Sequence, residues 1–173
     1  MNEYVPDGSD GDELPDDELS SEQYREAAEA TLQRLMAYLT PFGKNLPLQT
    51  SVADLDDPHL VGGALYSVPG SEKATYQILK VLLLDDFGVH VRLYGNGFSH
   101  RPATVAPDLL DTSPFFSLAP EDAGQEWPLS VGHLPLLART FLGMHAVFIA
   151  QTDVETEELE DYREWKEAGG GYL

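Results

Sequence analysis

The sequence predicts an α+β fold, a single domain in which a central, mainly antiparallel sheet packs against one helix near each end of the chain. The sheet is predicted because residues 76–94 hold two apolar runs joined by a short loop that ends in glycine, a pattern typical of a hairpin. The helices are predicted because apolar side chains recur at helical spacing in residues 21–40 and again in residues 153–168. A chain of 173 residues is long enough to bury one core without disulfides or structural metals.

Residues 1–19 form an acidic segment that we expect to be disordered. They hold eight acidic residues and no Lys or Arg, together with Gly, Ser and Pro. Such a segment buries too little apolar surface to offset the entropy that is lost when a chain becomes ordered. The predicted folded domain is therefore residues 20–173.

The first helix is predicted at residues 21–40. Ser20 followed by Gln23 matches the capping-box pattern, in which each side chain accepts a hydrogen bond from the backbone of the other. Pro41 and Gly43 end the helix because proline has no N–H to donate to the helical ladder. We expect one apolar stripe of this helix to pack on the sheet: Tyr24, Ala28, Leu32, Leu35, Met36 and Leu39.

The hairpin at residues 76–94 is predicted to lie at the centre of the sheet. Its first strand, residues 76–84, is apolar on both sides and therefore suits a strand with both faces covered. The second strand alternates, so one face is expected to meet the core and the other to point away from it. The core-facing side chains are Val89, Val91 and Leu93, and the outward ones are His90, Arg92 and Tyr94.

Shorter elements fill the rest of the predicted domain. Residues 59–68 are expected to give a short strand that two adjacent glycines interrupt, and residues 145–150 give another strand. Residues 106–135 contain five prolines and are predicted to be a long loop, followed by a short helix at residues 134–142.

The last helix is predicted at residues 153–168. Thr152 and Glu155 match the capping-box pattern, and acidic residues dominate its first turns, which suits the positive end of the helix dipole. Its expected apolar contacts are Leu159, Tyr162 and Trp165.

The charge of the chain argues against several classes of partner. Thirty acidic and ten basic residues give a net charge of −20, which repels nucleic-acid phosphates and anionic membranes. No apolar run approaches the roughly 18 residues that a membrane span needs, and the N-terminus lacks the pattern of a signal peptide. We therefore expect a cytoplasmic protein with no nucleic-acid or membrane partner.

No motif predicts catalysis or a cofactor. The chain has no cysteine, which excludes disulfides, thiolate catalysis and cysteine-based metal sites. A nucleophile elbow and a phosphate-binding glycine loop are also missing. The five histidines show no metal-ligand spacing, so neither a metal nor a catalytic residue is predicted, although distant ligands that converge around His90 and His100 stay an alternative.

The outward face of the hairpin is the candidate contact surface. Arg and Tyr are frequent at interface hot spots because they combine a large contact area with directional hydrogen bonds. The alternative is that Arg92 and Arg101 pair with the acidic C-terminal helix inside the domain. The candidate residues are His90, Arg92, Tyr94, Asn96, His100 and Arg101.

These features predict a non-catalytic domain that binds another protein with a basic or mixed-charge surface. A toxin-neutralising immunity protein and a chaperone-like adaptor are its two concrete forms. An enzyme or small-ligand binder that holds an anion at His90, Arg92 and Tyr94 is the alternative function. A third interpretation explains the acidity by adaptation to salt alone.

Overall fold

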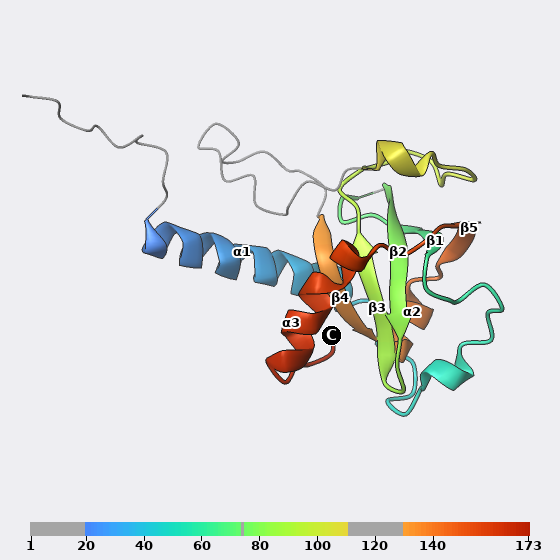
Figure 1. Cartoon of the computed structure of the whole chain (residues 1–173), viewed down its shortest axis with the longest axis horizontal. Coiled ribbons are helices and arrows are strands. Elements are labelled where there is room, and N and C mark those ends of the chain that lie inside the picture. The colour runs from blue at the N-terminus through green and yellow to red at the C-terminus, as the bar shows by residue number, and fades with distance from the viewer. Residues whose placement is uncertain (1–19, 74, 111–129) are drawn as a thin grey trace, which may run out of the picture.

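A five-stranded antiparallel sheet forms the centre of the protein. Its strands are β1 (Ala64–Pro69), β2 (Tyr76–Leu84), β3 (Gly88–Leu93), β4 (Val131–Leu137) and β5 (Val147–Gln151), in the spatial order β4-β3-β2-β1-β5. The computed structural model in Figure 1 describes residues 20–73, 75–110 and 130–173. The predicted α+β fold and its central hairpin are confirmed, since β2 and β3 pair with each other and lie inside the sheet. The predicted acidic tail at residues 1–19 lies outside the described residues.

One face of the sheet packs on a large apolar core. Val89, Val91 and Leu93 of β3 point into it and are at most 1% exposed, as their alternation predicts. The core also receives residues from α1 (Ser21–Leu39) and α2 (Ala138–Gly143). Each fully buried Leu or Val side chain contributes about 1.5–3 kcal/mol to stability, so this face holds much of the folding free energy.

Helix α1 begins as predicted but packs over less of its length. The side chain and backbone of Ser20 both bond to Gln23, which confirms the capping box. Leu35 and Leu39 are buried, whereas Leu32 is 54% exposed and Met36 is 42% exposed. The prediction that the whole apolar stripe packs on the sheet is therefore wrong. Figure 1 shows the reason, because the helix extends beyond the sheet and only its last turns reach the core.

The second face of the sheet is covered by the C-terminal part of the chain. Residues Thr156–Leu159 form a 3-10 turn, η4, which leads into α3 (Glu160–Glu167), so the predicted helix begins later than expected. Its capping box joins Glu155 to Glu158 instead of Thr152 to Glu155. A smaller apolar cluster covers the neighbouring part of this face: Leu65, Ile78, Tyr94 and Leu110.

Strand β4 departs from the sequence prediction. Residues 131–135 were expected to end a long loop and residues 134–142 to form a helix, but Val131–Leu137 is a strand and the helix is confined to α2. Pro135 is tolerated because β4 lies at an edge of the sheet, where a missing N–H costs no internal ladder bond. Residues 111–129 of the predicted loop lie outside the described residues. No helix within the described ranges is long and apolar enough to cross a bilayer.

Candidate functional site

His90 lies in a buried polar cluster between the sheet and α3. The residue is 0% exposed. Its Nε2 lies 2.8 Å from Oδ2 of Asp85, and its Nδ1 lies 2.9 Å from Nε2 of His133. The hydroxyl of Tyr172 also donates to Oδ2 of Asp85. The β2–β3 loop, β3, β4 and the segment after α3 each supply one member, so no local spacing in the sequence marks this cluster.

The surroundings of this cluster shift two of its pKa values. Burial raises the pKa of the Asp85 carboxyl, but hydrogen bonds from Tyr172, His90 and two backbone N–H groups outweigh it and hold the pKa at about 2. Burial also lowers the pKa of His133, repulsion from His90 lowers it further, and Asp161 raises it, with a net value of about 4. Asp85 is therefore ionised and His133 neutral at pH 7.

Two aromatic rings of α3 cover the imidazole of His90. The rings of Tyr162 and Trp165 stand nearly edge-on to it, each with its centre 4.8 Å away. An Asp–His pair of this geometry orients an imidazole for proton transfer in many enzymes. Here the imidazole meets aromatic rings, so the arrangement docks α3 on the sheet.

Arg92 belongs to a second, charged cluster under η4. Glu158 accepts from Nζ of Lys80 at 2.7 Å and from Nη1 of Arg92 at 3.3 Å. The side chains of Lys80 and Glu158 are only 8% and 10% exposed. The pKa of the neighbouring Tyr94 is raised, mainly by burial. The charge of Glu158 raises this pKa further, and Arg92 lowers it. Arg92 therefore pairs inside the domain with the acidic C-terminal region, which was the alternative to a contact surface.

Arg101 lies elsewhere and does not pair with an acid of the C-terminal helix. Its Nη1 donates to the carbonyl oxygen of Ser67 at 2.8 Å and to the hydroxyl of Ser67 at 2.9 Å. Its guanidinium lies 4.8 Å from the centre of the Tyr76 ring, a cation–π contact. Arg101 therefore fastens the segment after β3 to β1 and β2.

The last two candidate residues lie in the segment that follows β3. Nδ2 of Asn96 donates to the carbonyl oxygen of Leu109 at 3.3 Å. His100 is exposed, and its Nδ1 lies 3.0 Å from the hydroxyl of Ser99. The structure thus distributes the six candidate residues over separate environments, and their contact with a partner stays a prediction.

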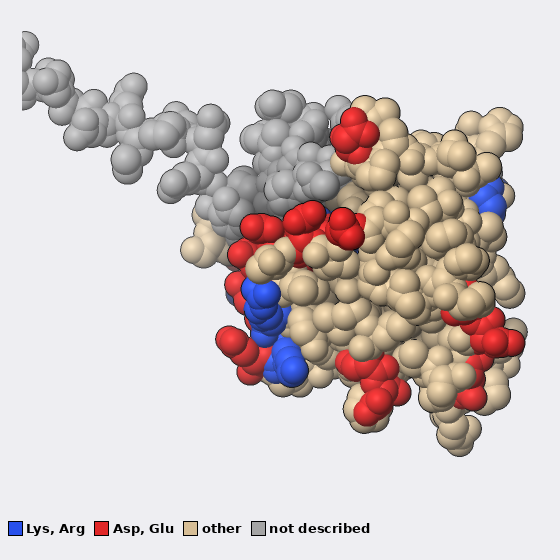
Figure 2. All heavy atoms as spheres, turned by 45° about the vertical axis from the view of Figure 1, so that its right-hand side comes forward, with Lys and Arg blue, Asp and Glu red and all other residues tan. Residues whose placement is uncertain are grey.

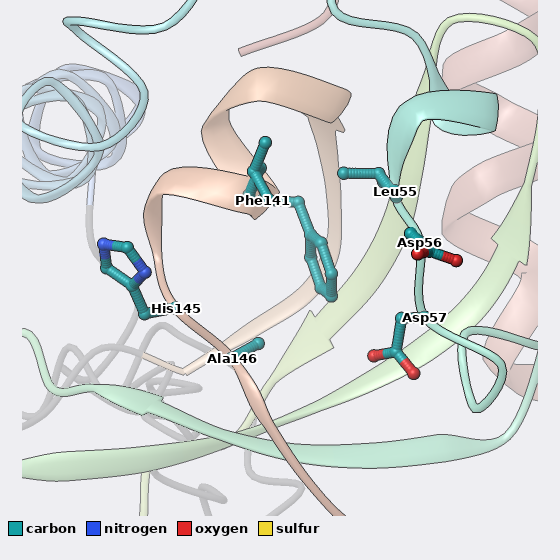
Figure 3. A pocket seen from close by; sticks show the side chains of 7 residues that line it. Leu55, Asp56, Asp57, Phe141, His145 and Ala146 are labelled. Atoms are coloured by element: carbon teal, nitrogen blue, oxygen red, sulfur yellow. The ribbon is translucent and has the colours of Figure 1, made fainter.

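A pocket at the start of β5 was not predicted from the sequence. It has a volume of about 320 Å³ and combines apolar walls with two carboxylates. Figure 3 shows the ring of Phe141 between His145 on one side and Asp56 and Asp57 on the other. The lining residues are Leu55, Asp56, Asp57, Phe141, Leu142, His145 and Ala146.

Local hydrogen bonds hold the acidic wall of this pocket in place. Asp57 accepts from the backbone N–H of His59 at 2.9 Å and from the hydroxyl of Tyr66 at 2.8 Å. Burial, followed by the bond to Asp57, raises the pKa of Tyr66, so the hydroxyl keeps its proton and remains a donor. Asp56 is exposed beside it.

His145 shapes the opposite wall. Its φ of 50° puts the residue in the left-handed region, which costs an L-residue other than glycine about 1–2 kcal/mol. The turn leads the chain from α2 into β5, and Ala146 then lines the pocket directly before Val147 starts the strand. The pocket and β5 are therefore continuous.

The two edges of the sheet differ. The outer edge of β4 is closed, because the N–H of Leu137 donates to the carbonyl oxygen of Leu173 at 2.7 Å and the N–H of Leu173 donates to that of Pro135 at 2.8 Å. The outer edge of β5 has no strand beside it within the described residues. Strand β5 is therefore the open edge of the sheet.

No group of three or more His, Asp and Glu side chains in the described part of the chain is arranged to hold a metal ion. Comparison with protein-family models, with curated proteins and with solved structures found no match for the chain.

Proposed function

We propose that the protein is a non-catalytic domain that binds another protein through the open sheet edge at β5. The observation that carries the proposal is the contrast between the two edges, one closed by Leu173 and the other open. Exposed edges present backbone N–H and C=O groups to other chains, and an added strand is a recurring mode of protein recognition.

The composition of β5 supports this role. Proteins commonly protect an edge strand with charged residues or proline, and Val147–Gln151 contains neither, although charged residues make up 23% of the chain. Val147 is 48% exposed. The strand has one protective feature, since its register with β1 skips Ile149 and makes a bulge there. The bulge divides the edge into two regular parts, one with Val147 and Phe148 and the other with Ala150 and Gln151.

The charge of the chain favours a basic or mixed-charge partner. The net charge is −20, and all ten basic residues lie in the described part. At least five of the basic side chains already contact protein groups, namely Arg25, Lys80, Arg92, Arg101 and Lys166. On the face in Figure 2, acidic side chains form separate groups around a wide area without charged side chains. Such a surface steers a cationic partner over a distance and leaves surface without charged side chains for contact.

Two concrete forms suit such a domain. A toxin-neutralising immunity protein binds one basic partner tightly, and a chaperone-like adaptor holds an extended segment of its client. An open edge with acidic residues near it suits either form. The alternative, an anion site at Arg92, is less well supported because an anion has to displace Glu158 from the guanidinium.

Affinity capture from native lysate at low salt tests the proposal with three versions of the full chain. Val147→Lys places a charge on the open edge, and Leu109→Lys makes the same change at a residue of the 3-10 turn Pro107–Leu109 that is 73% exposed and lies outside β5. We expect one stoichiometric partner with the original chain and with Leu109→Lys, and about tenfold less with Val147→Lys. Recovery of no such partner, or equal recovery with all three, overturns the proposal.

A further inference from the structure

We infer that the partner pairs with β5 through an extended segment and places a Lys or Arg side chain in the pocket formed by Leu55, Asp56, Asp57, Phe141 and Ala146. This inference rests on the proposed function, because the pocket lies at the start of the strand that the partner is proposed to extend. It adds the chemical class of the residue that the domain selects.

The position of the pocket relative to β5 is the first step. Ala146 lines the pocket and immediately precedes Val147. Side chains of Phe148 and Tyr66 lie on the same face of the sheet as the pocket, where their rings contact each other. Alternate residues of an added strand point to one face, at a spacing of about 4.7–4.9 Å from β5. A residue that pairs with this end of β5 therefore has the pocket beside its side chain.

The lining of the pocket selects the kind of side chain. Apolar groups of Leu55, Phe141 and Ala146 form one part, and the carboxylates of Asp56 and Asp57 form another. Lys and Arg have an apolar stem and a cationic head, so they match a site with both kinds of wall. No Lys or Arg lines the pocket.

The carboxylate of Asp57 is oriented before any partner arrives. Its Oδ1 accepts one backbone N–H and its Oδ2 accepts the Tyr66 hydroxyl. Each carboxylate oxygen has capacity for a further hydrogen bond, so both remain able to accept from a cationic head. Asp56 is exposed and supplies a second negative charge at the same wall. Charge complementarity therefore favours a basic side chain, carried by an extended segment, as the group that occupies the pocket.

The bulge at Ile149 sets the length of the pairing. Register with β1 is regular at Val147 and Phe148 and is interrupted before Ala150. The bulge thus divides the edge into two short regular parts, Val147–Phe148 and Ala150–Gln151, and the pocket lies beside the first of them. Selected segments should be short, with one basic residue at a fixed position and apolar residues near it.

Selection of short random peptides on the immobilised full chain tests this inference. We expect bound peptides to share one Lys or Arg at a constant distance from β-branched or aromatic residues. Asp57→Asn, in which the amide oxygen still accepts from Tyr66, should weaken the best peptide about tenfold and remove the preference for the basic residue. Asp108→Asn, the same change at an exposed residue outside the pocket, should leave both unchanged.

The outcomes separate the inference from the proposed function. Peptides that lose binding with Val147→Lys but show no basic preference overturn the inference and leave the open edge as the binding surface. If the preference for a basic residue is unchanged in both Asp57→Asn and Asp56→Asn, the inference is overturned in the same way. Peptides that bind equally well to the Val147→Lys chain, or no enrichment at all, overturn the proposed function and the inference together. If each variant unfolds at the same temperature as the original chain, a loss of binding is not caused by a loss of folding.

Discussion

The N–H of Leu173 donates at 2.8 Å to the carbonyl oxygen of Pro135, the one residue of β4 that has no N–H of its own. A second bond, from the N–H of Leu137 to the carbonyl oxygen of Leu173, completes the closure of this edge at 2.7 Å. Edge strands that stay exposed tend to pair with other chains. Within the described residues, one edge of the sheet is thus covered and the other has no strand beside it.

Deletion of residues 171–173 should destabilise the protein and open β4. It removes both backbone bonds of Leu173 and the bond from Tyr172 to the ionised Asp85, for an expected loss of about 2–4 kcal/mol. Urea denaturation measures the loss, and sedimentation at increasing concentration reports self-association through the opened edge. Leu173→Ala keeps the backbone bonds and is the control. A deletion that costs no more than this substitution contradicts the role of the edge bonds.

Glu158 should be the most sensitive acidic residue of the C-terminal region. Glu158→Gln leaves the charge of Lys80 almost buried without its anion, at an expected cost of about 3–5 kcal/mol in the free energy of unfolding. Glu157→Gln changes an exposed neighbour and should cost less than about 0.5 kcal/mol. Chemical denaturation of both variants decides the matter, and equal stabilities would show that the ion pair does not hold η4 on the sheet.

Stability should fall between pH 6.5 and pH 4 because of His133. Its pKa is lowered from 6.5 to about 4 in the folded state, so the unfolded chain binds a proton in this range and the folded chain does not. The contribution of His133 to the free energy of unfolding is present above pH 6.5 and is lost as the pH falls towards 4. The loss is on the order of 2 kcal/mol, because His133 is only partly buried. Denaturation of the original chain and of His133→Asn at several pH values checks this.

The exposed His100 supplies the control for that experiment. His100→Asn should keep the pH dependence of the original chain, whereas His133→Asn should flatten it. If both variants retain the full slope between pH 6.5 and pH 4, other groups cause the pH dependence. Asp85 affects stability only at lower pH. Its pKa is about 2 in the folded state, so its contribution to the free energy of unfolding is retained until the pH falls below 3.8, the ordinary pKa of the group.

The capping box of α1 should stabilise the helix locally. Ser20→Ala removes the hydroxyl that accepts from the backbone of Gln23, which costs about 1 kcal/mol of helix stability. Among the α1 side chains that the structure describes, the first buried one is Leu35, so the free energy of global unfolding should change little. Amide hydrogen exchange should accelerate in the first turns alone. A large fall in global stability would mean that these turns pack more firmly than their exposure indicates.

Local patterns in the sequence predicted much of the fold. The hairpin is clear because β2 is apolar on both faces and β3 alternates. The start of α1 is clear because Ser20 and Gln23 contact each other across one helical turn. The packing of α1 was overestimated, since a periodic stripe does not show how far the sheet extends beneath it. Strand β4 was missed because a proline such as Pro135 argues against a strand unless that strand lies at an edge of the sheet, and the sequence does not show which strands are edges.

The candidate site was less accessible to sequence reasoning. Alternation indicated that His90 and Arg92 point away from the core, but not that α3 covers His90 and η4 covers Arg92. Glu158 lies 66 residues from Arg92 in the chain, so only the fold brings them together. The pocket joins residues 55–57 to residues 141–146 in the same way. A run of five uncharged residues in β5 was the one local signal for the open edge.

Hydrogen–deuterium exchange of the full chain with and without the captured partner tests the central claim most directly. If the partner adds a strand to the open edge, amides in Val147–Gln151 gain protection on binding, and the Val147→Lys chain shows no such gain. Leu109→Lys should behave as the original chain does. Protection confined to other surfaces, such as the segment around His100, with exchange in β5 unchanged, would contradict it.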